Sequence, residues 1–140
     1  MINPIHHGAD VNTIRVYKVE PYVMAADVYT NESHRGRGGW TWYTGSAGWM
    51  YQFITRSFIG MRLMSDHLQF IPCFPISWPS VSVRYRYGRT NYAITVFQKN
   101  DIPVSTWKID NVQGEGDTIR LTDDGIEHQV ELRIKIKSTQ

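Results

Sequence analysis

The strongest constraint on the fold is a change in hydrophobic period near Asp66. Before this residue apolar side chains recur at helical spacing, and after it they alternate as they do along a strand. The chain is therefore expected to be α+β, with helices in residues 1–65 and an antiparallel β domain, part of a sandwich, in residues 66–140.

Two apolar helices are predicted in the first half. One covers residues 16–29, and the other runs from about Ser46 to Leu63, with Thr44 as a candidate N-cap. Both are apolar over much of their circumference, so they cannot bury each other completely. Either they are the end of a larger helical assembly, or they pack onto the β layer as a compact α+β domain.

The second half carries the signals of several strands and turns. The clearest is a β-hairpin over residues 79–98 around Gly88. The other predicted strands are 67–72, 105–112, 117–122 and 128–137, with turns at 113–117 and 122–125.

Composition excludes several classes of protein. The chain has 140 residues, 41% of them hydrophobic and 20% charged, which suits one modest core. A net charge of +2, with the arginines scattered among strands, does not favour nucleic acid. No run is long enough to span a membrane, and the N-terminus lacks the features of a secretory signal. The single cysteine, Cys73, fits a reducing compartment and is expected to be a small buried residue.

Residues 36–49, GRGGWTWYTGSAGW, form an unusual run with five glycines and three tryptophans. A helix starting after Tyr43 would offer free backbone N–H groups and the Thr44 hydroxyl to an anion. Upstream, His34, Arg35 and Arg37 are donors suited to an oxyanion. The plainer interpretation is that Thr44 only caps the helix and the glycines only form turns.

The aromatic and acidic residues around this run also have two interpretations. Trp40, Trp42 and Trp49 are either walls of a sugar site or anchors of a core. Glu20 either accepts hydrogen bonds from sugar hydroxyls or interacts with the dipole of a helix N-terminus. The histidine spacing resembles no zinc motif, so no metal site is predicted.

A resemblance to a known family adds to these patterns. The runs YKVEPYVMAADVY and HRGRGGWTWYTGSAGWMY closely resemble the C-terminal part of the catalytic domain of glycoside hydrolase family 94, the inverting sugar phosphorylases formerly called glycosyltransferase family 36. The likeness is greatest to the phosphorylase-like domain at the end of cyclic β-1,2-glucan synthases. INPI and FIPCFPISWPSVSVRYRYGRTNYAITV extend it over residues 2–98, and the tail fits more loosely.

The resemblance implies a fold and a reaction. Residues 1–65 would be the last helices of an (α/α)6 barrel and residues 66–140 the terminal β-sandwich. Phosphate would attack the anomeric carbon with inversion, giving an α-sugar 1-phosphate. By the resemblance His34, Thr44 and Gly45 hold phosphate. Glu20, in the family's EPY motif, contacts sugar hydroxyls.

The resemblance also sets expectations about partners. Inorganic phosphate is a co-substrate and no cofactor is expected. Met24 replaces an aromatic residue typical of disaccharide phosphorylases, which favours a β-glucan chain over a disaccharide as the sugar substrate. The general acid is expected upstream of this chain, so no catalytic residue is assigned here. The chain is then a cytoplasmic fragment, inactive alone, of a parent attached to the inner membrane. The alternative is a non-catalytic sugar-binding or scaffold module.

Overall fold

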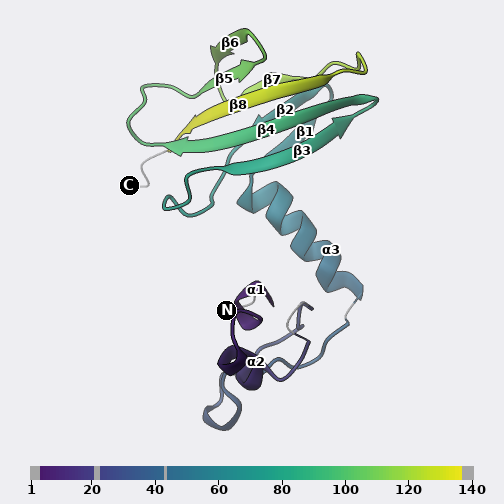
Figure 1. Ribbon diagram of the computed structural model, residues 1–140, viewed down its shortest axis with the longest axis vertical. Helices are drawn as coiled ribbons and strands as arrows, with labels where there is room; N and C mark the ends of the chain where they lie inside the picture. Colours follow the sequence, from purple (N-terminus) through teal and green to yellow (C-terminus); the bar gives the residue numbers. More distant parts are fainter. Residues whose placement is uncertain (1–3, 21–22, 43, 137–140) are drawn as a thin grey trace. The chain divides into compact units, whose positions relative to one another are not determined.

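The computed structural model describes residues 4–20, 23–42 and 44–136, and it forms a small α+β fold (Figure 1). The chain divides into two compact units, Met1–Gln52 and Phe53–Gln140. The first unit contains α1 (Pro4–His7), α2 (Val11–Tyr17), the 3-10 turn η1 (Glu32–His34) and α3 (Thr44–Gln52).

Helix α2 is set by a capping box that lies upstream of the predicted helix. The Asp10 carboxylate accepts hydrogen bonds from the backbone N–H groups of Asn12 and Thr13, at 2.7 and 3.0 Å. The helix ends at Lys18, which adopts the left-handed conformation with φ of 57°. The helix predicted over residues 16–29 is therefore wrong for the described residues beyond Tyr17.

The segment after α2 folds into a narrow loop instead of a helix. Val28 and Gly38 form an isolated antiparallel bridge, and η1 lies at the closed end between them. A Cβ on Gly38 would lie 2.4 Å from Val19 Cγ2, so no other residue fits at this crossing without a shift. Part of the glycine content of residues 36–49 thus leaves room for the side chains of Val19 and Tyr17, which lie against Gly38.

The second predicted helix is shorter than the sequence suggests. Helix α3 begins at Thr44 itself, so Thr44 is the first helical residue and the N-cap prediction is wrong. The helix continues as a π-helical segment, η2 (Phe53–Phe58), and then ends. The residues predicted as its last turn instead form the strand β1 (Met61–Met64), because Gly60, with φ of 76°, breaks the helical path. The predicted domain boundary between residues 65 and 66 stays a prediction.

The second unit is built from two sheets. A three-stranded sheet has the order β1-β2-β7, and a five-stranded sheet has the order β3-β4-β8-β5-β6. The remaining strands are β2 (His67–Phe70), β3 (Val81–Tyr87), β4 (Thr90–Lys99), β5 (Thr106–Ile109), β6 (Val112–Glu115), β7 (Thr118–Arg120) and β8 (Glu127–Lys135). The predicted hairpin around Gly88 is confirmed as β3–β4. The expectation of a purely antiparallel domain is wrong, because β4 and β8 pair in parallel.

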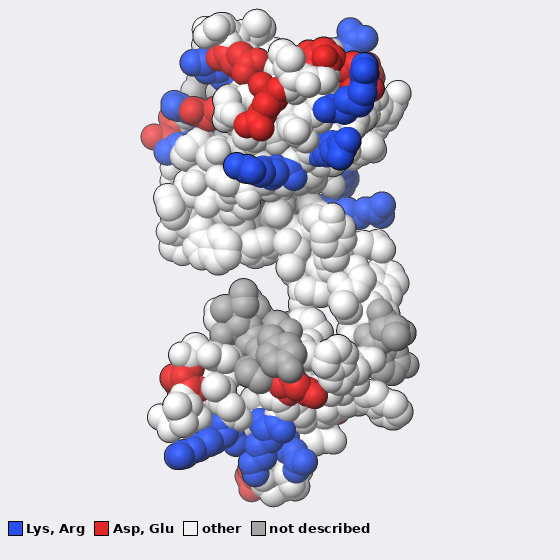
Figure 2. Space-filling view, turned by 45° about the vertical axis from the view of Figure 1, so that its right-hand side comes forward, with Lys and Arg blue, Asp and Glu red and all other residues white. Residues whose placement is uncertain are grey.

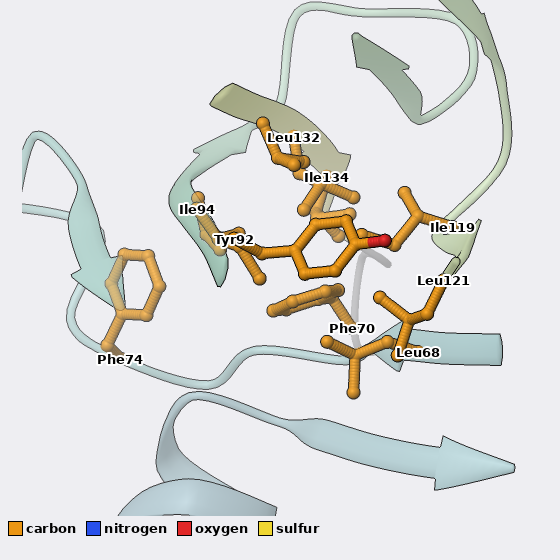
Figure 3. Packing of buried hydrophobic residues seen from close by; sticks show 11 residues of the cluster. Leu68, Phe70, Phe74, Tyr92, Ile94, Ile119, Leu121, Leu132 and Ile134 are labelled. Atoms are coloured by element: carbon orange, nitrogen blue, oxygen red, sulfur yellow. The ribbon is translucent and has the colours of Figure 1, made fainter. Parts of the chain in front are cut away.

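The core of the second unit lies between the two sheets (Figure 3). Phe70 from β2 is fully buried, as is Leu132 from β8, and Tyr92 from β4 is 2% exposed. The Tyr92 hydroxyl donates to the backbone carbonyl of Thr122 at 3.0 Å, so its one polar atom is satisfied. The second unit therefore has a hydrophobic core made from its own residues.

Two local expectations about this unit are corrected. The single strand predicted over residues 105–112 is a tight hairpin, β5–β6, which turns at Asp110 with φ of 50°. Part of the predicted 113–117 turn is therefore strand. Cys73 is exposed instead of buried, and its thiol donates to the backbone carbonyl of Ser57 at 3.0 Å.

A histidine links the β5–β6 turn to the loop before β8. His128 Nδ1 lies 2.7 Å from Asp110 Oδ2, and His128 Nε2 lies 3.0 Å from Asp124 Oδ2. The hydrogen bond to Asp110 is the main cause that raises the pKa of His128 above its usual 6.5. The same contact is the main cause that lowers the pKa of Asp110. The protonated His128 therefore stabilises both carboxylates, which repel each other.

This cluster predicts a pH dependence of folding. Because the pKa of His128 is raised, its contribution is present below pH 6.5 and is lost as pH rises through the folded-state pKa. Urea unfolding of the chain at about pH 5 and about pH 8 should show the wild type losing more stability at the higher pH than His128→Gln. His6→Gln, an exposed histidine, is the control. An equal pH effect in wild type and His128→Gln would contradict the assignment.

Candidate functional site

The start of α3 is the first candidate element. Its first backbone N–H groups have no carbonyl partner within the helix, and Gly45 is exposed there. A Cβ on Gly45 would approach nothing closer than Trp49 Cδ1, at 3.9 Å, which is an ordinary contact. Packing within the described residues therefore does not require glycine at this position. The side chain of Thr44 lies outside the described structure, so its predicted role stays a prediction.

His34 lies in η1, beside an open hollow of about 450 Å³ that it shares with Tyr29, Thr30, Asn31 and Arg37. His34 Nδ1 is 3.0 Å from the Ser33 hydroxyl, and its ring meets that of Tyr29 edge-on with centroids 6.1 Å apart. Arg37 thus shares the hollow with His34, as the upstream donor cluster suggested. No residue of α3 lines this hollow among the described ones.

Glu20 and Trp42 are brought together although they are distant in the sequence. The indole Nε1 of Trp42 donates to Glu20 Oε1 at 3.0 Å. The backbone of Glu20 and then this indole lower the pKa of the carboxyl, so Glu20 is held as an anion. Trp42 adopts φ of 59°, a conformation that is rare for a bulky residue. The contact joins the EPY motif to the tryptophan-rich run.

Asp27 has a structural role in the same unit. Its carboxylate accepts a hydrogen bond from the backbone N–H of Trp40 at 3.2 Å. A Cβ on Gly39 would lie 2.3 Å from Asp27 Oδ1, so the glycine makes room for this carboxylate. The glycine pair before Trp40 was the signal in the sequence for this close approach.

The tryptophans are not core residues within the described structure. Trp40, Trp42 and Trp49 are 71, 68 and 74% exposed, and Tyr51 is 70% exposed. By contrast, the only buried hydrophobic residues described in this unit are Tyr17 and Ala25. An aromatic surface of this size is typical of one that another part of a protein or a ligand covers.

Two of the four predicted site residues have partners in the glycine-rich run: the Glu20 carboxylate accepts from the Trp42 indole, and the His34 backbone carbonyl accepts from Arg37 N–H at 2.9 Å. No hydrogen bond or shared hollow among the described residues links His34 with Gly45. For Trp42, the partner of Glu20, the sequence left open whether it is a wall of a sugar site or an anchor of a core. Its signal was only the enrichment of tryptophan, because the pairing depends on a loop conformation that local patterns do not encode.

Comparison with known proteins shows to which family the first 60 residues belong. Residues 1–60 match the profile of the glycosyl hydrolase 94 superfamily, catalytic domain. Residues 1–60 belong to the glycosyl hydrolase 94 superfamily. The family segment includes α3, the hollow beside His34 and the Glu20–Trp42 contact.

Relatives of the family 94 segment extend the match into the strands. The chain is 44% identical over 96 residues to the cyclic beta-(1,2)-glucan synthase NdvB of Rhizobium meliloti (strain 1021), covering 69% of this chain and 3% of that protein. It is 29% identical over 116 residues to a solabiose phosphorylase of Paenibacillus borealis, covering 81% and 15%. It is 31% identical over 130 residues to an N,N'-diacetylchitobiose phosphorylase of Vibrio furnissii, covering 92% and 16%.

The chain thus spans less than a fifth of the length of each of these relatives. Within the described ranges, no group of three histidine, cysteine, aspartate or glutamate side chains is placed to hold a metal ion. None of the helices described here combines the length and apolar character that crossing a membrane requires.

Proposed function

We propose that this chain supplies the phosphate- and sugar-holding end of a family 94 phosphorylase domain, which cleaves β-glucosides or β-1,2-glucan with inorganic phosphate. The observation that carries the proposal is the family match over residues 1–60, which contains all four predicted site residues. The alternative of a non-catalytic module is weaker, because three of the relatives are phosphorylases by name.

The start of α3 is proposed to hold phosphate. Its unpaired backbone N–H groups and the helix dipole favour an anion at this end. Gly45 supports the proposal, because a glycine that packing does not require lets an anion approach the backbone closely. The Thr44 hydroxyl and His34 are proposed as further donors, and the Arg37 guanidinium beside His34 as a positive charge.

Glu20 is proposed to bind the sugar. Its lowered pKa keeps it ionised, so it accepts hydrogen bonds from hydroxyl groups and does not donate a proton. Trp42 donates its indole N–H to Oε1, and this contact orients the carboxylate toward its ligand.

In the proposed reaction a phosphate oxygen forms the new bond to the anomeric carbon while the glycosidic C–O bond breaks. The leaving oxygen takes a proton from a general acid, and the configuration is inverted. Asp66 does not suit that role, because the Arg120 guanidinium, 3.0 Å away, is the main cause that lowers its pKa. Asp27 binds the backbone of Trp40. We therefore place the acid on sequence outside this chain.

The proposal includes an (α/α)6 barrel whose last helices lie in residues 1–65, followed by a terminal β-sandwich in residues 66–140. Support comes from the exposed aromatic side chains of α3, which the remainder of the barrel would cover. The partner of this chain is then the upstream part of the same domain.

The test is phosphorolysis of β-1,2-glucan by the isolated chain. We expect no release of sugar 1-phosphate, because the general acid and the rest of the barrel are absent. Adding a separately expressed upstream segment of a family 94 catalytic domain should restore release. Sugar 1-phosphate production by the chain alone, or failure of every upstream segment to complement it, would count against the proposal.

A further inference from the structure

The outer face of the five-stranded sheet carries one continuous polar row. Strand register places Ser82, Thr95, Glu131, Lys108 and Gln113 side by side, one from each of β3, β4, β8, β5 and β6. Neighbouring strands lie about 4.8 Å apart, so the row is about 19 Å long. Each side chain in it can form hydrogen bonds.

This face is hollowed in three places that adjoin one another. Hollows of about 540 and 290 Å³ share Lys108 and Glu131 in their linings. A third, of about 190 Å³, shares Ala93 with the second. Ala93 is small and lies between the hollows, and Phe97 adds an aromatic surface to the second one. Together they form a shallow depression that crosses the sheet.

The charges lining these hollows balance. Four cationic and four anionic side chains line them, so the depression has no net charge. Figure 2 shows cationic and anionic side chains interspersed on the unit that carries the strands. A polyanion such as nucleic acid would meet as much repulsion as attraction here.

An apolar partner does not fit this face. None of the large hydrophobic residues exposed in the second unit lines the three hollows. They include Leu63, Met64, Ile71 and Trp78, which lie in or near β1 and the segment after β2. Val112 of β6 and Ile126 before β8 are exposed as well, but neither lines a hollow.

Two side chains of the row are free to bind a ligand. Across the ranges that the structure describes, the side chains of Lys108 and Gln113 have no hydrogen-bond or ion-pair partner. Glu131 is oriented by Arg133, whose Nε lies 2.8 Å from Glu131 Oε1. A donor, an amide and a fixed carboxylate side by side match the vicinal hydroxyl groups of a sugar.

We propose that the outer face of the five-stranded sheet is a binding surface for a neutral oligosaccharide chain. The ligand lies across the strands along the polar row. Lys108 and Gln113 donate to its hydroxyl oxygens, Glu131 accepts from its hydroxyl groups, and Phe97 lies against the apolar face of a ring. This site is separate from the residues proposed for phosphorolysis and can bind sugar without phosphate.

The test is an NMR titration of the full chain with a short linear β-1,2-glucan in phosphate-free buffer. We expect amide shifts in β4, β5, β6 and β8. Lys108→Ala and Gln113→Ala should each raise Kd about tenfold, because each removes a hydrogen bond to the ligand. Arg62→Ala, an exposed cation in β1, should leave Kd unchanged, and amide dispersion checks the fold of each variant.

Three results would overturn the proposal: no binding of the glucan, equal Kd in wild type and both variants, or tighter binding of dextran sulfate than of the neutral glucan. Because the titration contains no phosphate and probes strands outside residues 1–60, its failure leaves the proposed phosphorolysis untouched.

Discussion

Replacing Gly60 by alanine is expected to destabilise the β-rich unit by more than about 3 kcal/mol. A Cβ at this position would lie 2.0 Å from the backbone carbonyl oxygen of Ile71, and φ is 76°. The backbone of Ile71 cannot move freely, because its N–H donates to the Gly60 carbonyl at 2.9 Å and begins the three-stranded sheet. The measurement is the free energy of unfolding by urea.

Gly116→Ala is the matched control. Gly116 also has a positive φ, 111°, but a Cβ there would meet nothing within 4 Å. Gly116→Ala should therefore lower the free energy of unfolding only by the backbone strain, about 1–2 kcal/mol. Equal losses in the two variants would show that the close approach at Ile71 does not matter.

Replacing Thr44 by alanine in a full-length phosphorylase that carries this segment should raise KM for phosphate by at least about tenfold. A hydrogen bond to a charged ligand contributes about 1.5–3 kcal/mol, and 1.4 kcal/mol corresponds to a factor of ten. Steady-state kinetics with phosphate and sugar varied separately provide the measurement.

Three companion variants make this experiment specific. Ser46→Ala, two residues further along the same helix, should leave KM for phosphate unchanged. Glu20→Gln should raise KM for the sugar and leave that for phosphate unaltered. His34→Ala should act as Thr44→Ala does. Should His34→Ala leave phosphate binding intact while Thr44→Ala weakens it, the histidine assignment alone is wrong. An unaltered KM for phosphate in Thr44→Ala would show that the assignment of the phosphate site to α3 is wrong.

Several strands were predictable because their signals are local. The hairpin β3–β4 follows from strict alternation on both sides of Gly88, where a turn residue is required. The alternation along β4 agrees with burial in the structure, where Tyr92, Ile94 and Val96 are all buried. Such patterns depend only on the period of a strand, and the fold does not change that period.

Helix boundaries were less predictable because competing signals lie close together. Residues 16–29 have an apolar helical pattern, yet the capping box at Asp10 starts α2 earlier and Lys18 ends it. The backbone then pairs with residues 36–40 through hydrogen bonds such as that from Ala26 N–H to the Trp40 carbonyl, 2.8 Å. A distant partner for the backbone outweighed the local preference for a helix.

The sequence by itself determined that this chain has a helical and a β-rich part, that residues 2–98 resemble a phosphorylase domain, and where the β3–β4 hairpin turns. Tertiary structure alone decided that β8 lies beside β4 in parallel, that Trp42 holds Glu20, and that the polar row crosses five strands. The physical reason is the distance along the sequence over which each kind of interaction acts. Period and turn chemistry are properties of neighbouring residues, whereas strand neighbours and buried contacts depend on which distant segments best satisfy each other's hydrogen bonds and apolar surface.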